Sequence, residues 1–445
     1  MRTSFVLIAT LAMSGILNPA GAQVGTDPAP AGTTPSTLTF SEALQRALTA
    51  NLELAGARAE VSVAEAQTRQ TLSAILPRVS VSGNLTRNSD EASFGEGDDR
   101  RVIQSLNDYN YRLSVTQPIW AGNRERRALQ QSRLAIRLAQ QGVQSTEDQL
   151  LLNVAADYLS VVEAEQLLEV EQANVELARR RQKLATDLFE AGETTRVEPL
   201  RAEADVKEAE RRLTQVRQVR ENAAGRLRLG LALDGPVAVA DPGPALPPTP
   251  PQQVLLAEAE RNRPEVARAQ TSLEAARLEV AKQRGFALPV VTGEGGWVSQ
   301  KSPFPTDEYG FFTVRVNVPV YQGGEVGARV ATARERQRQA ELRLQQAQLA
   351  VREDVRQALV DLETSRASLA LAREQLTAAQ AEYQQASELY SAQEITALEA
   401  EAAETSLAAA RRAVVTSHLD LRIAELRVWA AAGMLKSSLF PEEAR

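Results

Sequence analysis

The side chains that most often carry catalysis are rare or scattered in this sequence. It has one histidine, His418, and no cysteine, which excludes a thiolate nucleophile, a disulfide framework and a cysteine-ligated metal. It also has no glycine-rich phosphate loop ending in lysine and no nucleophile elbow. One histidine without clustered acids does not make a metal site. The sequence therefore predicts a protein that is not an enzyme and that holds no metal or other cofactor.

Carboxylates do recur at a fixed distance from a threonine. In a capping box, the threonine hydroxyl accepts a hydrogen bond from the backbone N–H three residues on, and a Glu or Gln there accepts one in return. This pattern marks the start of a helix and not a reactive pair. It occurs at Thr39 with Glu42, at Thr195 with Glu198 and at Thr396 with Glu399, and Thr249 with Gln252 holds a matching place.

Alternating polarity predicts strands with one polar and one apolar face. From Tyr111 to Ile119 and from Phe312 to Val320 most apolar residues fall at every second position, which is the period of a half-buried strand. A strand of similar pattern precedes each, so four are expected at about 78–88, 108–120, 290–299 and 309–321. The polar faces carry Arg112, Ser114 and Thr116 in the first copy and Thr313, Arg315 and Asn317 in the second.

The elements occur twice along the chain. Thr39 to Leu233 and Thr249 to Gly433 each read as helix, two strands, a very long helix and a helix. Each long helix runs without proline for about 67 residues, roughly 100 Å at 1.5 Å per residue, and ends at Gly192 or near Gln393. The two shorter helices of a copy are together nearly as long, so they are expected to stack end to end alongside it. We predict a mostly α fold with a small β part, built from this duplicated helix-strand-strand-long helix-helix unit.

The chain divides into six segments. They are a signal peptide (1–22), a flexible leader (23–38), a first structural repeat (39–233), a Pro-rich connector (234–253), a second structural repeat (254–434) and a C-terminal tail (435–445). The loops at 88–107 and 299–308 are expected to face solvent, and the connector to run as an extended strap.

The amino terminus predicts export from the cytoplasm. A basic Arg2, an apolar run from Phe5 to Leu17 and small residues ending at Ala22 match a cleaved signal peptide. No later apolar run approaches the roughly 18 residues of a membrane-spanning helix, so any crossing of a membrane must be made by strands. The net charge of -7 gives no indication of the basic surface that binds nucleic acid.

The apolar strand faces have no third layer of this chain to cover them, so outer-membrane lipid is the expected cover. Each unpaired backbone group in hydrocarbon costs several kcal/mol, so four strands with two open edges cannot stand alone. Several copies must close one barrel, and two, three or four copies would all give the even strand number of bacterial barrels. The six polar residues named above would then face a water-filled lumen.

In these respects the chain resembles a known family. The duplicated order, the exported start, Pro118-Ile119-Trp120-Ala-Gly and Pro319-Val320-Tyr321-Gln-Gly-Gly before the long helices, and the Leu-Phe-x-Ala-Gly-x-x-Thr break at 188–195 are similar to the TolC-like outer-membrane efflux factors. The resemblance covers roughly residues 38–434. It implies a homotrimer with a twelve-stranded transmembrane β-barrel continued by a twelve-helix periplasmic α-barrel. Such a protein is a passive exit duct of an efflux or secretion system, engaged by a periplasmic adaptor and powered by an inner-membrane transporter.

The resemblance also assigns roles to the breaks between helices. It implies a periplasmic aperture lined by Glu399, Tyr390, Glu394 and Glu198. It implies adaptor contact at the helix tips through Gly192, Glu193, Thr194, Gln393 and Ile395. Glu198 and Glu399 can thus cap a helix, line the aperture, or do both. The presence of glycine at position 192 is explained by a left-handed C-cap alone. At the place of Ile395, some family members have an arginine that holds the aperture closed, and this chain has the isoleucine instead. A strongly latched closed state is therefore not expected.

Some features allow more than one interpretation. Trp120 and Tyr321, where strand becomes helix, fit either interfacial aromatics or core packing. The basic run ARRRQK at 178–183 fits a solvated helix face. A periplasmic coiled-coil adaptor and a structural scaffold are alternative functions. Two copies with inserted strands argue against the adaptor, and the in-phase alternation of those strands argues against the scaffold.

Overall fold

The computed structural model describes residues 37–95, 97, 101–240, 246–301, 307–392 and 394–440. The predicted signal peptide and most of the leader lie outside the described residues, as do parts of both strand-connecting loops and of the connector. Within the described residues, no helix combines the length and the apolar character needed to cross a membrane.

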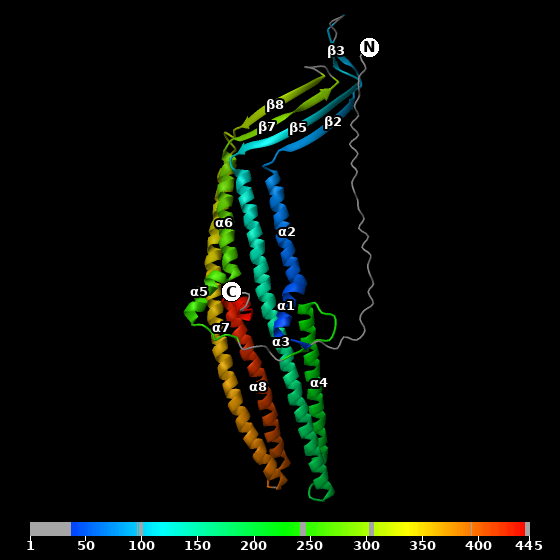
Figure 1. The fold of residues 1–445 in the computed structure, drawn as a ribbon, viewed down its shortest axis with the longest axis vertical. Coiled ribbons are helices and arrows are strands. Elements are labelled where there is room, and N and C mark those ends of the chain that lie inside the picture. Colours follow the sequence, from blue (N-terminus) through cyan, green and yellow to red (C-terminus); the bar gives the residue numbers. More distant parts are fainter. Residues whose placement is uncertain are drawn as a thin grey trace. The chain divides into compact units, whose positions relative to one another are not determined.

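The described chain contains the duplicated unit that the sequence predicts (Figure 1). The first copy consists of α1 (Phe40–Ala50), α2 (Leu52–Ser73), β2 (Arg78–Arg87), β5 (Asn107–Ala121), α3 (Arg124–Glu190) and α4 (Val197–Leu231). The second consists of α5 (Gln252–Asn262), α6 (Pro264–Arg284), β7 (Val290–Gln300), β8 (Glu308–Asn317), α7 (Glu325–Ser391) and α8 (Ala397–Ala431). A 3-10 turn, η2 (Gly285–Ala287), precedes β7, and α9 (Leu435–Leu439) lies in the predicted C-terminal tail. Both long helices have 67 residues, so the mostly α, duplicated fold is confirmed.

The four longer strands form one antiparallel sheet in the order β2-β5-β7-β8. Its register sets Ser114 opposite Ser80 on one side and opposite Gly296 on the other, so the alternation in the sequence becomes two distinct faces. β2 and β8 are the edges, each paired with a single neighbour in the described part of the chain. All four strands join helices at the same end of the sheet (Figure 1).

Three details of the predicted strands and loops are wrong. β8 ends at Asn317 and not near 321, because its partner β7 begins at Val290 and the preceding Pro289 has no N–H to offer Val318. The loop expected at 88–107 contains a short hairpin of β3 (Ala92–Phe94) and β4 (Arg101–Gln104). The leader expected at 23–38 ends in β1 (Thr37–Leu38), which pairs in parallel with β6 (Ala238–Val239) of the connector.

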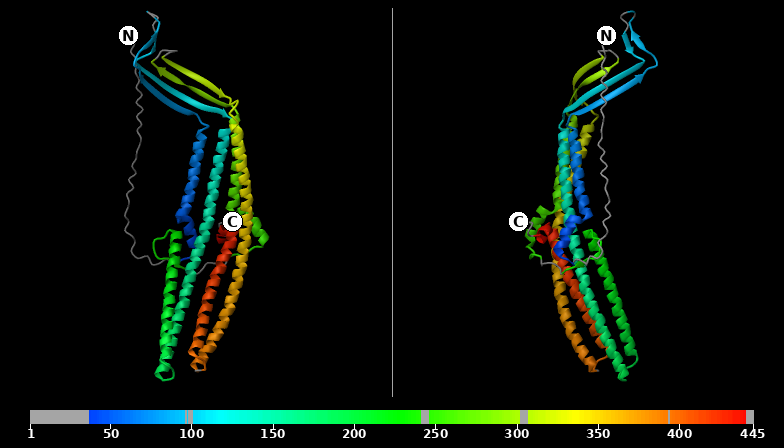
Figure 2. Two further views of the ribbon diagram at one scale, coloured as in Figure 1. Left: turned by 180° about the vertical axis from the view of Figure 1, so that it is seen from behind. Right: turned by 45° about the vertical axis from the view of Figure 1, so that its right-hand side comes forward.

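Helix α3 is the central helix of the described chain. It packs against α2 and α4 of its own copy and against α6 and α8 of the other, and Figure 2 shows them alongside it from two directions. The helices α2 and α4 meet at Asn51, whose side-chain oxygen accepts from the N–H groups of Glu53 and Leu54 and whose Nδ2 donates to the Gly230 carbonyl at 3.0 Å. The two shorter helices therefore stack end to end along the long one.

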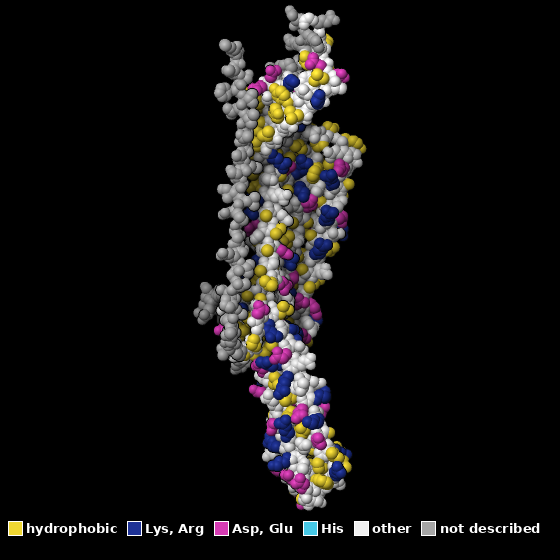
Figure 3. Space-filling model, turned by 90° about the vertical axis from the view of Figure 1, so that its right-hand side faces the viewer, with side chains coloured by type: hydrophobic (Ala, Val, Ile, Leu, Met, Phe, Trp, Pro, Cys, Tyr) yellow, Lys and Arg dark blue, Asp and Glu magenta, His cyan; other side chains and the backbone are white. Residues whose placement is uncertain are grey.

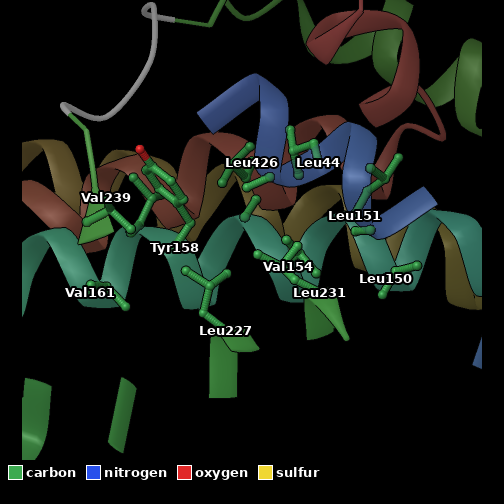
Figure 4. Packing of buried hydrophobic residues seen from close by; sticks show 14 of the residues in the cluster. Leu44, Leu150, Leu151, Val154, Tyr158, Val161, Leu227, Leu231, Val239 and Leu426 are labelled. Atoms are coloured by element: carbon green, nitrogen blue, oxygen red, sulfur yellow. The ribbon is translucent and has the colours of Figure 1, made fainter. Parts of the chain in front are cut away.

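The main apolar core surrounds Tyr158 of α3, where α1, α4 and the connector converge (Figure 4). Fully buried side chains there include Leu44, Leu151, Leu227 and Leu231. The Tyr158 ring meets Phe40 edge-on, with centroids 5.3 Å apart. Its hydroxyl lies 2.9 Å from the Leu38 carbonyl oxygen and 2.8 Å from that of Ala240. One phenol thus holds both β1 and β6 against the long helix.

The capping box predicted at Thr39 is present, and the one suggested at Thr249 is not. Glu42 N–H donates to the Thr39 hydroxyl oxygen at 3.3 Å, and Thr39 N–H donates to the Glu42 carboxylate at 2.9 Å. In the second copy α5 begins at Gln252 with Pro251 as its N-cap. Thr249 cannot start this helix because Pro250 precedes another proline, which disfavours a helical conformation.

The sheet meets the helices at a close contact between two glycines. Gly122, with φ +63°, leads from β5 into α3, and a side chain there would collide with the carbonyl oxygen of Gly285. Conversely, a Cβ at Gly285 would lie 2.6 Å from the Gly122 carbonyl oxygen. The Arg124 guanidinium covers the neighbouring Phe286 ring, 4.5 Å from its centroid. The two copies therefore touch, backbone to backbone, where the sheet ends.

Replacing Gly122 with alanine is expected to disrupt this junction, and Gly323 offers a matched control. Gly323 also has a positive φ, of +58°, but nothing lies within 4 Å of an added Cβ. Gly323→Ala therefore carries only backbone strain, about 1–2 kcal/mol, whereas Gly122→Ala adds the collision with Gly285. The yield of folded, heat-resistant protein should fall strongly for Gly122→Ala and little for Gly323→Ala. Equal losses would show that the glycine contact is not required.

Candidate functional site

The six polar residues predicted to share a surface lie on one face of the sheet. They are Arg112, Ser114 and Thr116 on β5 and Thr313, Arg315 and Asn317 on β8. On this face Arg112 Nη2 lies 3.6 Å from Glu294 Oε1, and its guanidinium lies 4.6 Å from the centroid of the Phe311 ring. The hydroxyls of Ser80 and Ser114 are hydrogen-bonded at 2.9 Å. The polar face is thus a charged, hydrogen-bonded surface.

The opposite face of the sheet is apolar, and the described part of the chain leaves it uncovered. Val81 on β2 is 77% exposed and Phe312 on β8 is 78% exposed. The face also exposes Val79, Leu85, Leu113, Val115, Trp297, Val314 and Val316. Soluble monomers rarely expose a contiguous apolar patch of this kind. At the base of the sheet Tyr321 is 87% exposed, so core packing is the wrong interpretation for Tyr321.

The first helix tip has the left-handed C-cap predicted at Gly192. This residue has φ +80°, and its N–H donates to the Phe189 carbonyl at 3.0 Å. The N–H of Glu193 donates to the Leu188 carbonyl at 2.9 Å, which completes a Schellman motif. Gly192 and Glu193 are exposed and Thr194 is half-buried.

The second tip repeats the hydrogen bond that spans more residues of the chain. Glu394 N–H donates to the Leu389 carbonyl at 2.9 Å, which is the counterpart of the bond from Glu193. Glu394 is exposed and Ile395 is half-buried. Gln393, predicted as an adaptor contact at this turn, lies outside the described residues.

A capping box forms at the second tip, as predicted. Glu399 N–H donates to the Thr396 hydroxyl oxygen at 3.3 Å, and Thr396 N–H donates to the Glu399 carboxylate at 2.8 Å. The next residue, Ala400, donates its N–H to the Thr396 carbonyl at 3.2 Å and begins the helical ladder of α8.

The capping box predicted at the first tip is wrong. Helix α4 begins at Val197 with Arg196 as its N-cap and no side-chain cap. Pro199, which holds the place of Ala400, has no N–H to donate to the Thr195 carbonyl. Glu198 N–H donates to that carbonyl at 3.2 Å, as Glu399 N–H does to the Thr396 carbonyl at 3.1 Å, but the bond equivalent to that of Ala400 cannot form. Helix α4 therefore begins one residue later than α8 does relative to its threonine.

The four predicted aperture residues lie at the two tips, with Glu198 in the first turn of α4, Tyr390 near the end of α7, Glu394 in the second turn and Glu399 in the first turn of α8. Tyr390 and Glu198 lie near each other, and burial first and the Glu198 charge second raise the pKa of the Tyr390 hydroxyl. Glu399 is exposed in its capping box, where the backbone N–H and then the hydroxyl of Thr396 lower the pKa of its carboxyl group. Glu394 is exposed in the second turn.

A half-buried charge cluster near the tips was not predicted from the sequence. Arg181 of α3 has a side chain that is 14% exposed, and it pairs with Asp205 of α4 and with Glu401 and Glu404 of α8, the last two at 3.6 and 3.4 Å. Burial raises the pKa of the Glu404 carboxyl group, and the Arg181 charge opposes this shift. The run at 178–183 was expected to be a solvated face, which is wrong for Arg181. The cluster joins the α3–α4 hairpin to α8.

A second ion pair joins α3 to α8 farther from the tips. Glu171 has a side chain that is only 2% exposed, and it accepts from Arg412 at 2.9 Å and from Asn174 at 3.2 Å. The sequence carried one signal for these contacts between the repeats. Arg181 and Glu382 hold equivalent places in the two copies but have opposite charges, so the copies do not pack in the same way there.

A family model for outer membrane efflux proteins matches residues 43–232 and 255–434, within the first and the second repeat. The chain belongs to this family. It is therefore an outer-membrane channel component of a tripartite efflux or secretion system, located in the outer membrane and extending into the periplasm. The family match sets aside the periplasmic adaptor and the structural scaffold as alternatives.

Named relatives and solved structures agree with this assignment. The outer membrane efflux protein BepC of Brucella suis biovar 1 (strain 1330) is 24% identical over 403 residues, which cover 89% of this chain and 86% of BepC. The crystal structure of CusC superposes with a TM-score of 0.78 at 19% identity, covering 90% of this chain and 93% of CusC. The CmeC outer membrane channel of Campylobacter jejuni gives a TM-score of 0.76 at 18% identity, with coverage of 89% and 86%. The predicted TolC-like fold is confirmed.

In this efflux protein, Thr396→Ala is expected to loosen the start of α8, while Thr195→Ala leaves the start of α4 unchanged. Loss of a threonine N-cap costs about 1 kcal/mol, which corresponds to roughly fivefold faster exchange of the amides it protects. Hydrogen exchange in the first turn of each helix measures the effect. Equal acceleration in both variants would contradict the difference that Pro199 imposes.

Proposed function

We propose that three copies of this chain close one transmembrane barrel, with β2 of each copy pairing with β8 of the next. In the order β2-β5-β7-β8 the two edge strands are antiparallel to each other, so pairing between copies continues the same pattern around the ring. Closure removes the cost of unpaired backbone groups in hydrocarbon, several kcal/mol each. Three copies give twelve strands, the number implied by the resemblance to TolC-like factors. The observation that carries the proposal is an exposed apolar face between two open edges.

In this assembly the two faces of the sheet meet different solvents. Outer-membrane lipid covers the apolar face. The strands β2, β7 and β8 have 10, 11 and 10 residues, and a tilted strand needs about 9–11 to cross a bilayer. The polar face lines a water-filled lumen. Three pairs of Arg112 and Glu294, one pair from each copy, then surround the path of the exported molecule.

The helices continue the barrel as a periplasmic tunnel. Each copy supplies four rods of similar length, namely α3, α7, α2 stacked on α4, and α6 stacked on α8, so three copies supply twelve. The tips narrow this tunnel to an aperture lined by Glu399, Tyr390, Glu394 and Glu198. A ring of carboxylates at a constriction attracts cations and favours their passage or their binding.

The tips also dock a periplasmic adaptor. The contact consists of Gly192, Glu193 and Thr194 at the first tip and Gln393 and Ile395 at the second, and the exposure of the first turn supports it. An inner-membrane transporter supplies both the cargo and the energy. The duct itself is passive and is not an enzyme, in keeping with a sequence that lacks catalytic motifs.

The assignment of the faces predicts opposite results for two neighbouring residues of β2. A lysine facing lipid near the middle of the bilayer costs about 2–4 kcal/mol, whereas one facing the lumen does not. Val81→Lys should therefore reduce the amount of heat-resistant oligomer in the outer membrane, while Ser82→Lys should assemble normally and change single-channel conductance. Native mass spectrometry of the unaltered protein should give the mass of three chains.

Either of two results would overturn this arrangement. Equal tolerance of Val81→Lys and Ser82→Lys would mean that the faces are not divided between lipid and water. A stable mass of two or four chains would reject the trimer and leave the barrel itself intact.

The aperture assignment predicts that the charge of Glu399 matters independently of its cap. Glu399→Gln removes the charge and keeps an oxygen that can accept from Thr396, while Thr396→Ala breaks the cap and keeps the charge. In planar bilayers, Glu399→Gln should weaken block by divalent cations added on the periplasmic side severalfold, with little change for Thr396→Ala. Unchanged block in Glu399→Gln would remove Glu399 from the aperture.

A further inference from the structure

The helices carry an excess of cations directly below the sheet. We consider the six helical residues nearest to the sheet in each of α2, α3, α6 and α7, a depth of roughly 9 Å at 1.5 Å per residue. Their cations are Arg69, Arg124, Arg126, Arg127, Lys282, Arg284 and Arg329, and their carboxylates are Glu125, Glu279 and Glu325. The whole chain has a net charge of -7, so this local excess of four positive charges runs against the composition. We call the seven cations the basic collar.

Most of the basic collar is not neutralised by the described part of the chain. Lys282 pairs with Glu279 and Arg329 pairs with Glu325. Arg69, Arg126 and Arg284 are exposed, and no carboxylate of the described residues lies within ion-pair distance of them. Like charges held near one another repel, so this surface favours a bound anion.

Arg126 of the collar lies under the apolar face of the sheet. Arg126 borders a hollow together with Ile119, Trp120 and Glu125. Ile119 is exposed where β5 bulges, and Trp120 lies opposite Val291 on the apolar face. Figure 3 shows Lys and Arg side chains gathered on the helices beneath the apolar side chains of the sheet. The collar therefore begins where the surface suited to hydrocarbon ends.

We propose that the basic collar binds the headgroups of anionic phospholipids in the periplasmic leaflet of the outer membrane. A hydrocarbon core of about 30 Å within a bilayer of about 40–45 Å leaves roughly 5–8 Å for each headgroup layer, which is close to the depth of the collar. Aromatic residues mark this boundary in membrane proteins, and exposed Tyr321 lies at the level where β8 passes into α7. Guanidinium groups bind phosphate oxygens through several donors in one plane. The inference rests on the proposed barrel.

The test compares phosphatidylglycerol with phosphatidylcholine on the intact, detergent-purified channel. Arg126→Gln with Arg284→Gln removes two exposed collar cations. Arg180→Gln with Arg343→Gln is the matched control, since both arginines are exposed and lie roughly 27 Å or more along their helices from the sheet. Phosphatidylglycerol should bind the unaltered channel more tightly than phosphatidylcholine, and added salt should weaken it. The collar variant should lose roughly 25-fold in affinity, about 1 kcal/mol per cation, and the control should lose almost none.

Three results would overturn the proposal. The first is that phosphatidylcholine binds as tightly as phosphatidylglycerol. The second is that the collar variant still prefers phosphatidylglycerol, and the third is that inorganic phosphate at the same concentration displaces phosphatidylglycerol completely. If the collar variant does not assemble, the lipid preference and salt dependence of the unaltered channel, read by native mass spectrometry, decide the question alone. The oligomer mass and conductance are recorded on the same preparation. A failure of lipid binding in an intact conducting trimer therefore rejects the collar and leaves the proposed barrel standing.

Discussion

Backbone hydrogen bonding at the edges of the sheet is the constraint on which the rest of this structure depends. Strands β2 and β8 each have one neighbour in the described chain, and the apolar face between them has no cover. Hydrocarbon would satisfy that face but not the edges, because lipid offers no hydrogen bonds. In the proposed barrel, other copies of the chain complete the sheet. Since all four strands join helices at the same end, closing the sheet would also arrange the helices as a ring.

The duplication supplies rods of equal length, and the differences between the copies determine what happens at the tips. Both long helices have 67 residues, so the two turns would lie at the same level of the proposed ring. Their local chemistry is not the same. Pro199 prevents a capping box in the first copy, whereas Ala400 permits one in the second. Arg181 binds carboxylates of both repeats of its own chain, while Glu382, which holds the equivalent place in the second repeat, has the opposite charge. A ring built from several chains, each with two unlike repeats, would alternate between two kinds of tip.

Sequence periodicity was enough to predict the elements and the faces, because both depend on residues close together in the chain. The positions of polar residues such as Arg112 and Thr313 in the alternating pattern predicted the shared polar face, and the glycine at 192 predicted the left-handed turn. Contacts between distant segments could not be derived in this way. The Tyr158 hydroxyl meets carbonyl oxygens of both the leader and the connector, and no local pattern marks either one. The missing cap at Thr195 could have been foreseen, since Pro199 lacks the N–H that would begin the helical ladder at the Thr195 carbonyl.

The two ion pairs between α3 and α8 differ in burial, and this difference indicates where the hairpins can separate. Glu171 is almost completely buried, and removing its partner Arg412 from it would cost about 3–5 kcal/mol, since a buried charge would be left unpaired. Near the tips the carboxylates around Arg181 are more exposed, and Glu401 is 37% exposed, so water can replace part of that pairing. About 21 residues, or roughly 31 Å of helix, separate Glu171 from Gly192. In the proposed aperture, opening of the tips would therefore bend the hairpins within this span, while the helices between Glu171 and the sheet remain packed.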